Sequence, residues 1–164
     1  MTTEKINTTD ESEVEQFLTF ELAGEFYGVE ILAVQEIRGW EPVREIPNTP
    51  DFIKGALNLR GSIVPIIDLR ERFGMESVEY SAITVVIVLS VKVADDTHIM
   101  GIVSDTVSDV VDINKGDIKQ APKLGSKIDT RYMQGMYIGK EHMIMLLDVD
   151  KLLNLEEIES IVGI

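Results

Sequence analysis

The chain has 164 residues, of which 45% are hydrophobic and 27% charged, a balance typical of a soluble globular protein. Its formal net charge of −14 at pH 7 disfavours nucleic acid and anionic membrane surfaces as partners. The absence of cysteine excludes disulfides, thiolate metal sites and cysteine nucleophiles.

The N-terminal segment, residues 1–15, is polar and acidic, and we expect a flexible lead-in there. It has no basic start followed by an apolar stretch, so no secretory signal is expected. The longest apolar run, Ile83 to Leu89, is far shorter than the ~20 residues that a membrane-spanning helix requires. These features predict a cytoplasmic protein.

Strand-like alternation begins at Gln16 and predicts a hairpin, with strands at 17–22 and 26–29 joined by a turn at 23–25. Other strands, rich in β-branched and apolar residues, are predicted at 62–69, 84–93, 98–103 and 142–149. Pro65 lacks a backbone donor, which predicts a sheet edge or a bulge for its strand.

Helical signals are sparse, so the fold class is predicted to be mainly β. A short turn of helix is expected within 31–37, and another at 50–54, where Pro50 stands early and Gly55 ends the turn. The longest helix is expected at the C-terminus, over 148–162, because its leucines form a partial apolar stripe.

Three short patterns occur in both halves of the chain, in the same order. Residues 28–37 align with 101–110 at an offset of 73, whereas 53–55 with 133–135 and 65–69 with 145–149 align at 80. Chance similarity among apolar strands is the alternative, but three ordered blocks favour a duplication. Because ~60 residues alone bury too little surface, the halves are expected to pack as two small barrels through a shared apolar interface.

The expected organisation is one domain over 16–155, with approximate halves at 16–80 and 81–150. The first strand is a candidate for exchange between these halves.

No catalytic or metal-binding motif is present, so neither an enzyme nor a cofactor is expected. The two histidines, His98 and His142, lie within or beside predicted strands and lack metal-ligand spacing. The acidic segment from Asp148 resembles a calcium loop but has Leu152 and Leu153 where an oxygen ligand and glycine belong. An ordinary helix N-terminus explains it better.

The most informative segments are 34–39 and 53–70. The second predicts a hairpin with a type II′ turn at Gly61-Ser62. Arg60 stands beside that turn and is predicted to pair with Glu36 across adjacent strands. A solvated pair worth under ~1 kcal/mol is the alternative.

At these residues the chain resembles the CheW family, over Phe17 to about Leu155. The shared motifs are Phe26-Tyr27-Gly28, Val34-Gln35-Glu36-Ile37-Arg38-Gly39, Asn48-Thr49-Pro50, Asn58-Leu59-Arg60-Gly61, Thr84-Val85-Val86-Ile87-Val88-Leu89, Gly101-Ile102-Val103 and Val107-Ser108-Asp109-Val110. Leu124 departs from the pattern, because relatives often carry an aromatic residue there.

This resemblance implies two SH3-like five-stranded β-barrels around a common core. It also implies a non-enzymatic adaptor, or scaffold, that couples transmembrane chemoreceptors to the histidine kinase CheA in bacterial chemotaxis arrays. The regulatory domain of the kinase is then one partner. The cytoplasmic tips of methyl-accepting chemoreceptors are the other, held in a groove between the barrels at the inner face of the membrane.

Carried over residue by residue, the resemblance assigns residues to each surface. The kinase interface comprises Glu36, Ile37, Val43 and Arg60 on the first barrel and Leu124 on the second. The receptor groove comprises Ile31, Val34, Val86 and Val103. For each apolar residue, plain core packing is the alternative. Gly55 and Gly61 are expected to serve backbone geometry at turns.

Other functions remain open at this point. An adaptor for another kinase–receptor system, such as surface motility, has the same sequence features. A small β-barrel enzyme or ligand-binding domain needs a pocket with convergent polar groups. A nucleic-acid-binding barrel is disfavoured by the net charge.

Overall fold

The structure of the chain is a computed structural model that describes residues 13–120 and 130–154. Its strands are β1 (Val14–Leu22), β2 (Glu25–Glu30), β3 (Val34–Gly39), β4 (Ile53–Leu59), β5 (Ser62–Asp68), β6 (Val85–Val93), β7 (Asp96–Ser104), β8 (Thr106–Asn114), β9 (Met133–Ile138) and β10 (Met143–Leu147). Its short helices are η1 (Ile31–Ala33), α2 (Leu69–Arg72), η2 (Lys115–Asp117), η3 (Thr130–Tyr132) and α3 (Val149–Leu152). The predicted mainly β class is confirmed. None of the helices in the described part of the chain is long and apolar enough to span a membrane.

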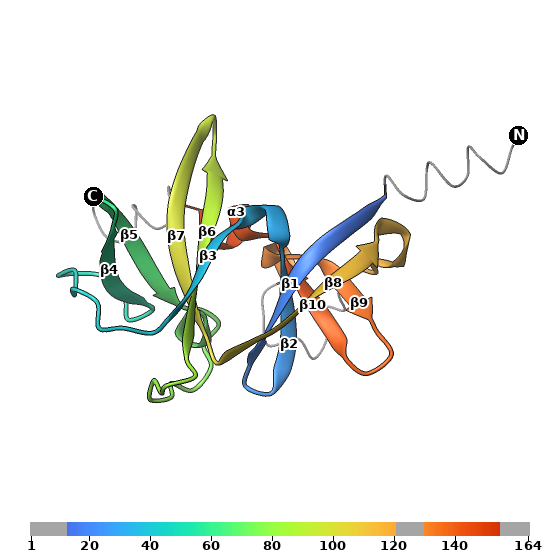
Figure 1. The fold of residues 1–164 in the computed structure, drawn as a ribbon, viewed down its shortest axis with the longest axis horizontal. Helices are drawn as coiled ribbons and strands as arrows, with labels where there is room; N and C mark the ends of the chain where they lie inside the picture. Colours follow the sequence, from blue (N-terminus) through green and yellow to red (C-terminus); the bar gives the residue numbers. More distant parts are fainter. Residues whose placement is uncertain (1–12, 121–129, 155–164) are drawn as a thin grey trace, which may run out of the picture.

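The strands form two five-stranded sheets that lie side by side (Figure 1). The first sheet has the order β3-β6-β7-β5-β4, and the second has the order β8-β1-β2-β10-β9. In each sheet, a residue beyond one edge strand bonds to the opposite edge strand: Arg44 pairs with Ala56 in the first, and Lys119 with Met136 in the second. These bridges draw the two edges of each sheet together, as in a small barrel.

The two sheets exchange strands reciprocally. The hairpin β1–β2 opens the chain but lies in the second sheet, where β2 runs parallel to β10. The hairpin β6–β7 opens the second half but lies in the first sheet, where β7 runs parallel to β5. The sequence halves at 16–80 and 81–150 are therefore not the spatial units, and two strands of each half are exchanged rather than one.

The strand registers support the duplication. Gly28 lies opposite Leu146 in one parallel pair, and Gly101 lies opposite Ile66 in the other, which reproduces the offsets of 73 and 80. Thr19 pairs with Gly28, as Val88 pairs with Gly101. The first strand of each half is therefore related by an offset of 69, because the β6–β7 hairpin is longer than the β1–β2 hairpin.

The largest apolar cluster is shared between the sheets. It includes Leu18, Phe20 and Tyr27 from the second sheet and Ile87 and Leu89 from the first, all fully or nearly fully buried. Each sheet also has its own smaller cluster on the other face of its strands. Strand β6 is apolar on both faces for this reason, and its sequence shows a continuous apolar run instead of alternation.

The predicted helices are shorter in the structure. Within 31–37 only η1 is helical before β3 begins, and the turn predicted to end at Gly55 is followed by β4, which contains Gly55. Helix α3 ends at Leu152, and Leu153 caps it with a non-helical ψ of 39°. The predicted helix is thus interrupted after its first turn, and residues beyond Asn154 lie outside the described part of the chain.

Pro65 does not mark an edge, because β5 lies between β7 and β4. The N–H and C=O groups of Ala56, its partner on β4, both bond to Arg44, so the Ala56–Pro65 pair requires no hydrogen bond. On the other side, the pairing of β5 with β7 begins only at Ile66. The bulge in this region is on β4, between Ile53 and Gly55. A missing N–H is tolerated at Pro65 because no ladder bond needs it.

Candidate functional site

The predicted pair between Arg60 and Glu36 is present. The Arg60 Nη2 atom lies 3.6 Å from Glu36 Oε2, and Glu36 also accepts a 3.3 Å hydrogen bond from Arg38. The Arg60 side chain is 90% exposed, whereas that of Glu36 is 31% exposed. A single long contact at this exposure adds little stability, so most of the Arg60 guanidinium is available to a partner.

The strands that carry this pair are not adjacent, contrary to the prediction. Glu36 is on β3 and Arg60 follows β4, and these strands are the two edges of the first sheet. They meet because the sheet curls and Arg44 bonds to Ala56. The charges are therefore brought together by closure of the sheet and not by a strand ladder.

The turn beside the pair also differs from the prediction. Strand β4 ends at Leu59 and β5 begins at Ser62, so the turn residues are Arg60 and Gly61, with φ values of 54° and 87°. Two positive φ values define a type I′ turn rather than type II′. Asn58 Oδ1 accepts a 3.0 Å hydrogen bond from the Gly61 N–H. Arg60 therefore projects from the turn itself.

Two apolar residues carried over to the kinase interface lie near this pair in the chain and differ in burial. Ile37 is 45% exposed, and Val43 is partly buried against the first sheet's own apolar cluster. Gly55 has a φ of 145°, and a Cβ atom there would lie 2.0 Å from the Arg44 carbonyl oxygen and 2.9 Å from Val43. Gly55 therefore fixes the path of the segment that contains Val43.

The residues assigned to the receptor groove divide into two groups. Val86 and Val103 are 0% and 3% exposed and belong to the cluster inside the first sheet. Both valines are core residues, which is the alternative considered for them. Neither side chain is exposed enough to contact a receptor directly. Ile31 and Val34 are partly buried against the shared cluster.

A cavity of about 260 Å³ opens beside Ile31, where β2 ends and η1 begins. Its lining residues come from the start of β1 and from the β2–η1 junction: Val14, Glu15, Gln16, Glu30, Ile31 and Leu32. Leu32 is 90% exposed, and Val14, which also lines the cavity, is 43% exposed. We call this cavity the η1 groove. The sequence analysis missed Leu32 and Val14, and the apolar run at 31–34 was the available signal.

Carboxylates border the η1 groove. Glu15 pairs with Lys115 at 3.0 Å. Partial burial, with the neighbouring carboxylates of Glu15 and Asp148, raises the pKa of Glu30 above its usual value, although a hydrogen bond with Gln134 opposes the shift. The lining of the groove therefore combines apolar side chains with acidic ones.

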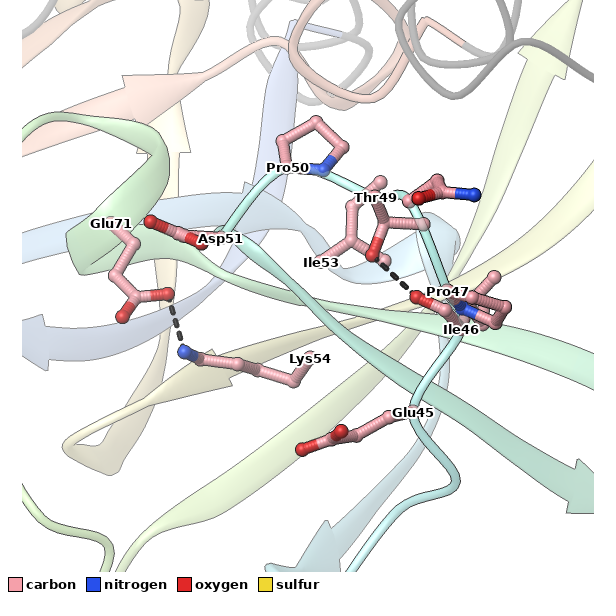
Figure 2. Close-up of a pocket in the computed structure, with 10 residues that line it drawn as sticks. Glu45, Ile46, Pro47, Thr49, Pro50, Asp51, Ile53, Lys54 and Glu71 are labelled. Carbon is pink, nitrogen blue, oxygen red and sulfur yellow. Dashed lines mark hydrogen bonds and ion pairs between the residues drawn. The ribbon is translucent and has the colours of Figure 1, made fainter.

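A larger cavity of about 420 Å³ lies under the loop that leads into β4 (Figure 2). Its one lysine, Lys54, is bound to Glu71 at 2.5 Å, and the Thr49 hydroxyl donates to the Ile46 carbonyl at 2.9 Å. These polar groups bond within the protein instead of converging on the cavity. Over residues 13–120 and 130–154, no group of three or more acidic or histidine side chains is arranged to hold a metal ion. Leu124 lies outside the described residues.

Comparisons with known proteins agree with this architecture. The CheW-like domain family matches residues 16–157. The chemotaxis protein CheW of Klebsiella aerogenes is 48% identical over 143 residues, which cover 87% of this chain and 84% of that protein. The chemotaxis protein CheW of Rhizobium meliloti is 32% identical over 145 residues, covering 88% and 91%.

A solved structure shares the fold. The crystal structure of the scaffolding protein TtCheW from Thermoanaerobacter tengcongensis has a TM-score of 0.75 at 32% identity, covering 84% of this chain and 86% of that chain. The chain therefore belongs to the CheW family of chemotaxis scaffold proteins.

Proposed function

We propose that this protein is a non-enzymatic cytoplasmic adaptor that couples transmembrane chemoreceptors to the histidine kinase CheA in receptor arrays. Family membership supports a chemotaxis scaffold. The observation that carries the finer proposal is that the chain has two chemically different exposed surfaces on different elements. One is the charged Glu36–Arg60 surface of the first sheet, and the other is the η1 groove, which is lined by apolar and acidic side chains.

The Glu36–Arg60 surface suits the kinase regulatory domain. Arg60 projects from a type I′ turn and is largely exposed beside the partly exposed Glu36. Ile37, the next residue on β3, exposes its apolar side chain on the other face of that strand. Exposed charged groups contribute specificity and association rate at protein interfaces, which supports a kinase contact at this pair. Leu124, which lies outside the described residues, stays a predicted contact with the kinase.

The η1 groove suits the tip of a receptor helical hairpin. Helices commonly dock by inserting apolar side chains into a groove, and Leu32 with Ile31 offers the matching apolar contact. Val86 and Val103 can affect receptor binding only through the shape of the first sheet, since both side chains are buried.

The first test is retention of CheA by this protein carrying Arg60→Glu. We expect retention to fall at least tenfold, because a partner carboxylate would meet a like charge. Lys92→Glu, the same charge change at an exposed position of the same sheet, is the control and should leave retention unchanged. Adding Glu36→Arg should not restore binding if the partner contacts Arg60 directly. Unchanged retention in Arg60→Glu would refute the assignment of this surface.

The second test is receptor retention by Leu32→Ser. We expect receptor binding to weaken while CheA retention stays at the wild-type level, because Leu32 exposes its side chain beside the η1 groove and packs little within the protein. Ile83→Ser, at a 69% exposed position before β6, is the matched control. Equal loss in both variants, or no loss in Leu32→Ser, would contradict the receptor assignment.

A further inference from the structure

The described chain crosses from one sheet to the other at two places. The first crossing is η1, between β2 of the second sheet and β3 of the first. The second is Asp105, the single residue between β7 of the first sheet and β8 of the second. The offset of 73 relates Leu32 to Asp105, so the two crossings are equivalent points of the duplication.

The Asp105 crossing is held by a dense set of polar contacts. Arg70 binds the carboxylate through two of its nitrogens, Nε to Oδ1 at 2.9 Å and Nη2 to Oδ2 at 2.6 Å. The Ala23 N–H donates to Oδ2 at 2.9 Å, and the Asp105 N–H donates to the Glu21 carbonyl at 3.1 Å. Arg70 is on α2, which directly follows β5 of the first sheet, and Ala23 is in the β1–β2 turn of the second sheet. These contacts therefore join α2, the β1–β2 turn and the crossing residue.

Arg70 is itself held in place. Asp68 caps α2 by accepting from the Glu71 N–H at 3.2 Å, and it accepts from the Tyr80 hydroxyl at 2.5 Å. Leu69 is fully buried in the shared cluster. The remaining nitrogen of Arg70 donates to the Glu76 carbonyl at 3.2 Å. The guanidinium is thus fixed on one sheet before it reaches the carboxylate at the crossing.

The equivalent contacts at the η1 crossing differ. The offset of 80 relates Arg70 to Asp150, and the offset of 69 relates Ala23 to Lys92. Asp150 itself accepts from the Lys92 N–H at 2.8 Å, so the carboxylate is on the helix instead of on the crossing. Leu32 stands in the place of Asp105 and points to solvent. Helix η1 has no side-chain cap.

We propose that the Arg70–Asp105 clamp fixes the angle at which the two sheets meet. Arg70 is then a positioning residue for any surface formed by both sheets. The shared apolar cluster holds the sheets together, but apolar contact is non-directional and permits small rotations. A bidentate Arg–carboxylate pair has a fixed planar geometry and supplies the missing direction. The proposal does not depend on which partner occupies the groove.

The test measures the distance between the two sheets in the free full-length protein. The chain has no cysteine, so Ile63→Cys on β5 and Met143→Cys on β10 provide two unique spin-label sites. Both positions are exposed and are related by the offset of 80. Pulsed electron–electron double resonance is recorded for this doubly spin-labelled protein, the parent. It is also recorded for the parent carrying Arg70→Gln, Arg70→Lys or Asp105→Asn.

We expect Arg70→Gln and Asp105→Asn to broaden or shift the distance distribution, and Arg70→Lys to do so in part, because lysine keeps the charge but loses the fork. Lys54→Gln is the matched control. It breaks the Lys54–Glu71 pair, which has similar burial but lies within the first sheet and α2. A distribution in Arg70→Gln that coincides with the parent, or an equal change in Lys54→Gln, would overturn the proposal. Cooperative thermal unfolding of each variant confirms that a folded protein is compared.

Discussion

In the second sheet the bulge on β8 faces Thr19, whereas in the first sheet the equivalent bulge on β3 faces Val88. Both residues are almost fully buried. The Thr19 hydroxyl donates to the Asp109 carbonyl at 2.9 Å and accepts from the Asp109 N–H at 3.0 Å. The same backbone detour is thus stabilised by two polar contacts in one sheet and accommodates an apolar side chain in the other.

Two equivalent glycines, Gly55 and Gly135, also share a backbone feature: each lies very close to a carbonyl oxygen of a neighbouring segment. A Cβ at Gly55 would lie 2.0 Å from the Arg44 carbonyl oxygen, and one at Gly135 would lie 2.7 Å from that of Lys119. Of these two glycines, Gly55 has a positive φ and Gly135 does not. The duplication therefore preserves the topology and the tight points of the backbone, while the side chains at equivalent positions have diverged.

The divergence extends to the two crossings. Leu32 and Asp105 are equivalent, yet one is an exposed apolar residue and the other is clamped between the sheets. A repeated fold can thus present different chemistry at its two related crossings.

The largest expected effect comes from the glycine pair. Gly55→Ala should lower the free energy of unfolding by about 3 kcal/mol or more, because it adds both a backbone clash and a strained φ. Gly135→Ala, with the clash alone, should cost about 2 kcal/mol. Gly24→Ala, with a φ of 80° and open space, should cost about 1 kcal/mol and isolates the dihedral effect. Urea unfolding measures all three, and the comparison fails if Gly55→Ala is no worse than Gly24→Ala.

An intermediate effect is expected at the two bulges. Thr19→Val removes both hydrogen bonds to Asp109 and should cost about 1–2 kcal/mol in urea unfolding. Val88→Thr should stay within about 1 kcal/mol of wild type, because an equivalent bulge offers the backbone of Glu36 to the new hydroxyl. A loss above about 2 kcal/mol in Val88→Thr would show that the two bulges differ in geometry.

The smallest effects are expected from the carboxylates at the two crossings, with opposite pH dependence. Burial opposes ionisation of Asp105, but hydrogen bonds from Arg70 and Ala23 and the charge of Arg70 outweigh it, so its pKa lies below the usual 3.8. Its contribution to stability is present above pH 3.8 and is lost as the pH falls through the lower, folded-state pKa. Glu30 has a raised pKa, so its ionisation opposes folding increasingly as the pH rises above 4.5.

Measured against wild type, Asp105→Asn should therefore be destabilised at pH 7, by an amount that shrinks below pH 3.8. Glu30→Gln should be stabilised at pH 7, by an amount that shrinks as the pH falls through the raised folded-state pKa and is lost below about pH 4.5. Thermal unfolding across pH 3 to 7 records both trends. The same sign of change at pH 7 in the two variants would contradict the contrast between the crossings.

Much of this architecture was predictable from local patterns. The hairpin of β1 and β2, the mainly β class and the offsets of 73 and 80 follow from apolar spacing and turn residues. The Glu36–Arg60 pair also followed from the types of residue in two motifs. The first strand was a candidate for exchange, but the reciprocal exchange of both hairpins was not predicted, because it depends on parallel pairs such as β2 with β10, which join distant parts of the chain.

Burial was the weakest part of the predicted site. Val86 lies on a strand that is apolar on both faces, so periodicity gives no sign of which residues are exposed. Leu32 has the same apolar character as its neighbours, yet only its position at a crossing between sheets exposes it.

The amino-acid sequence by itself indicated most of the strands, the β1–β2 turn and the duplication, since these depend on residue spacing and backbone preferences over a few positions. Tertiary structure alone decided that β1–β2 and β6–β7 exchange places, that β3 and β4 bring Glu36 to Arg60, and that Asp105 meets Arg70 while Leu32 stays exposed. These contacts join residues that are far apart in the chain, and they form only when two curved sheets close and pack on one apolar core.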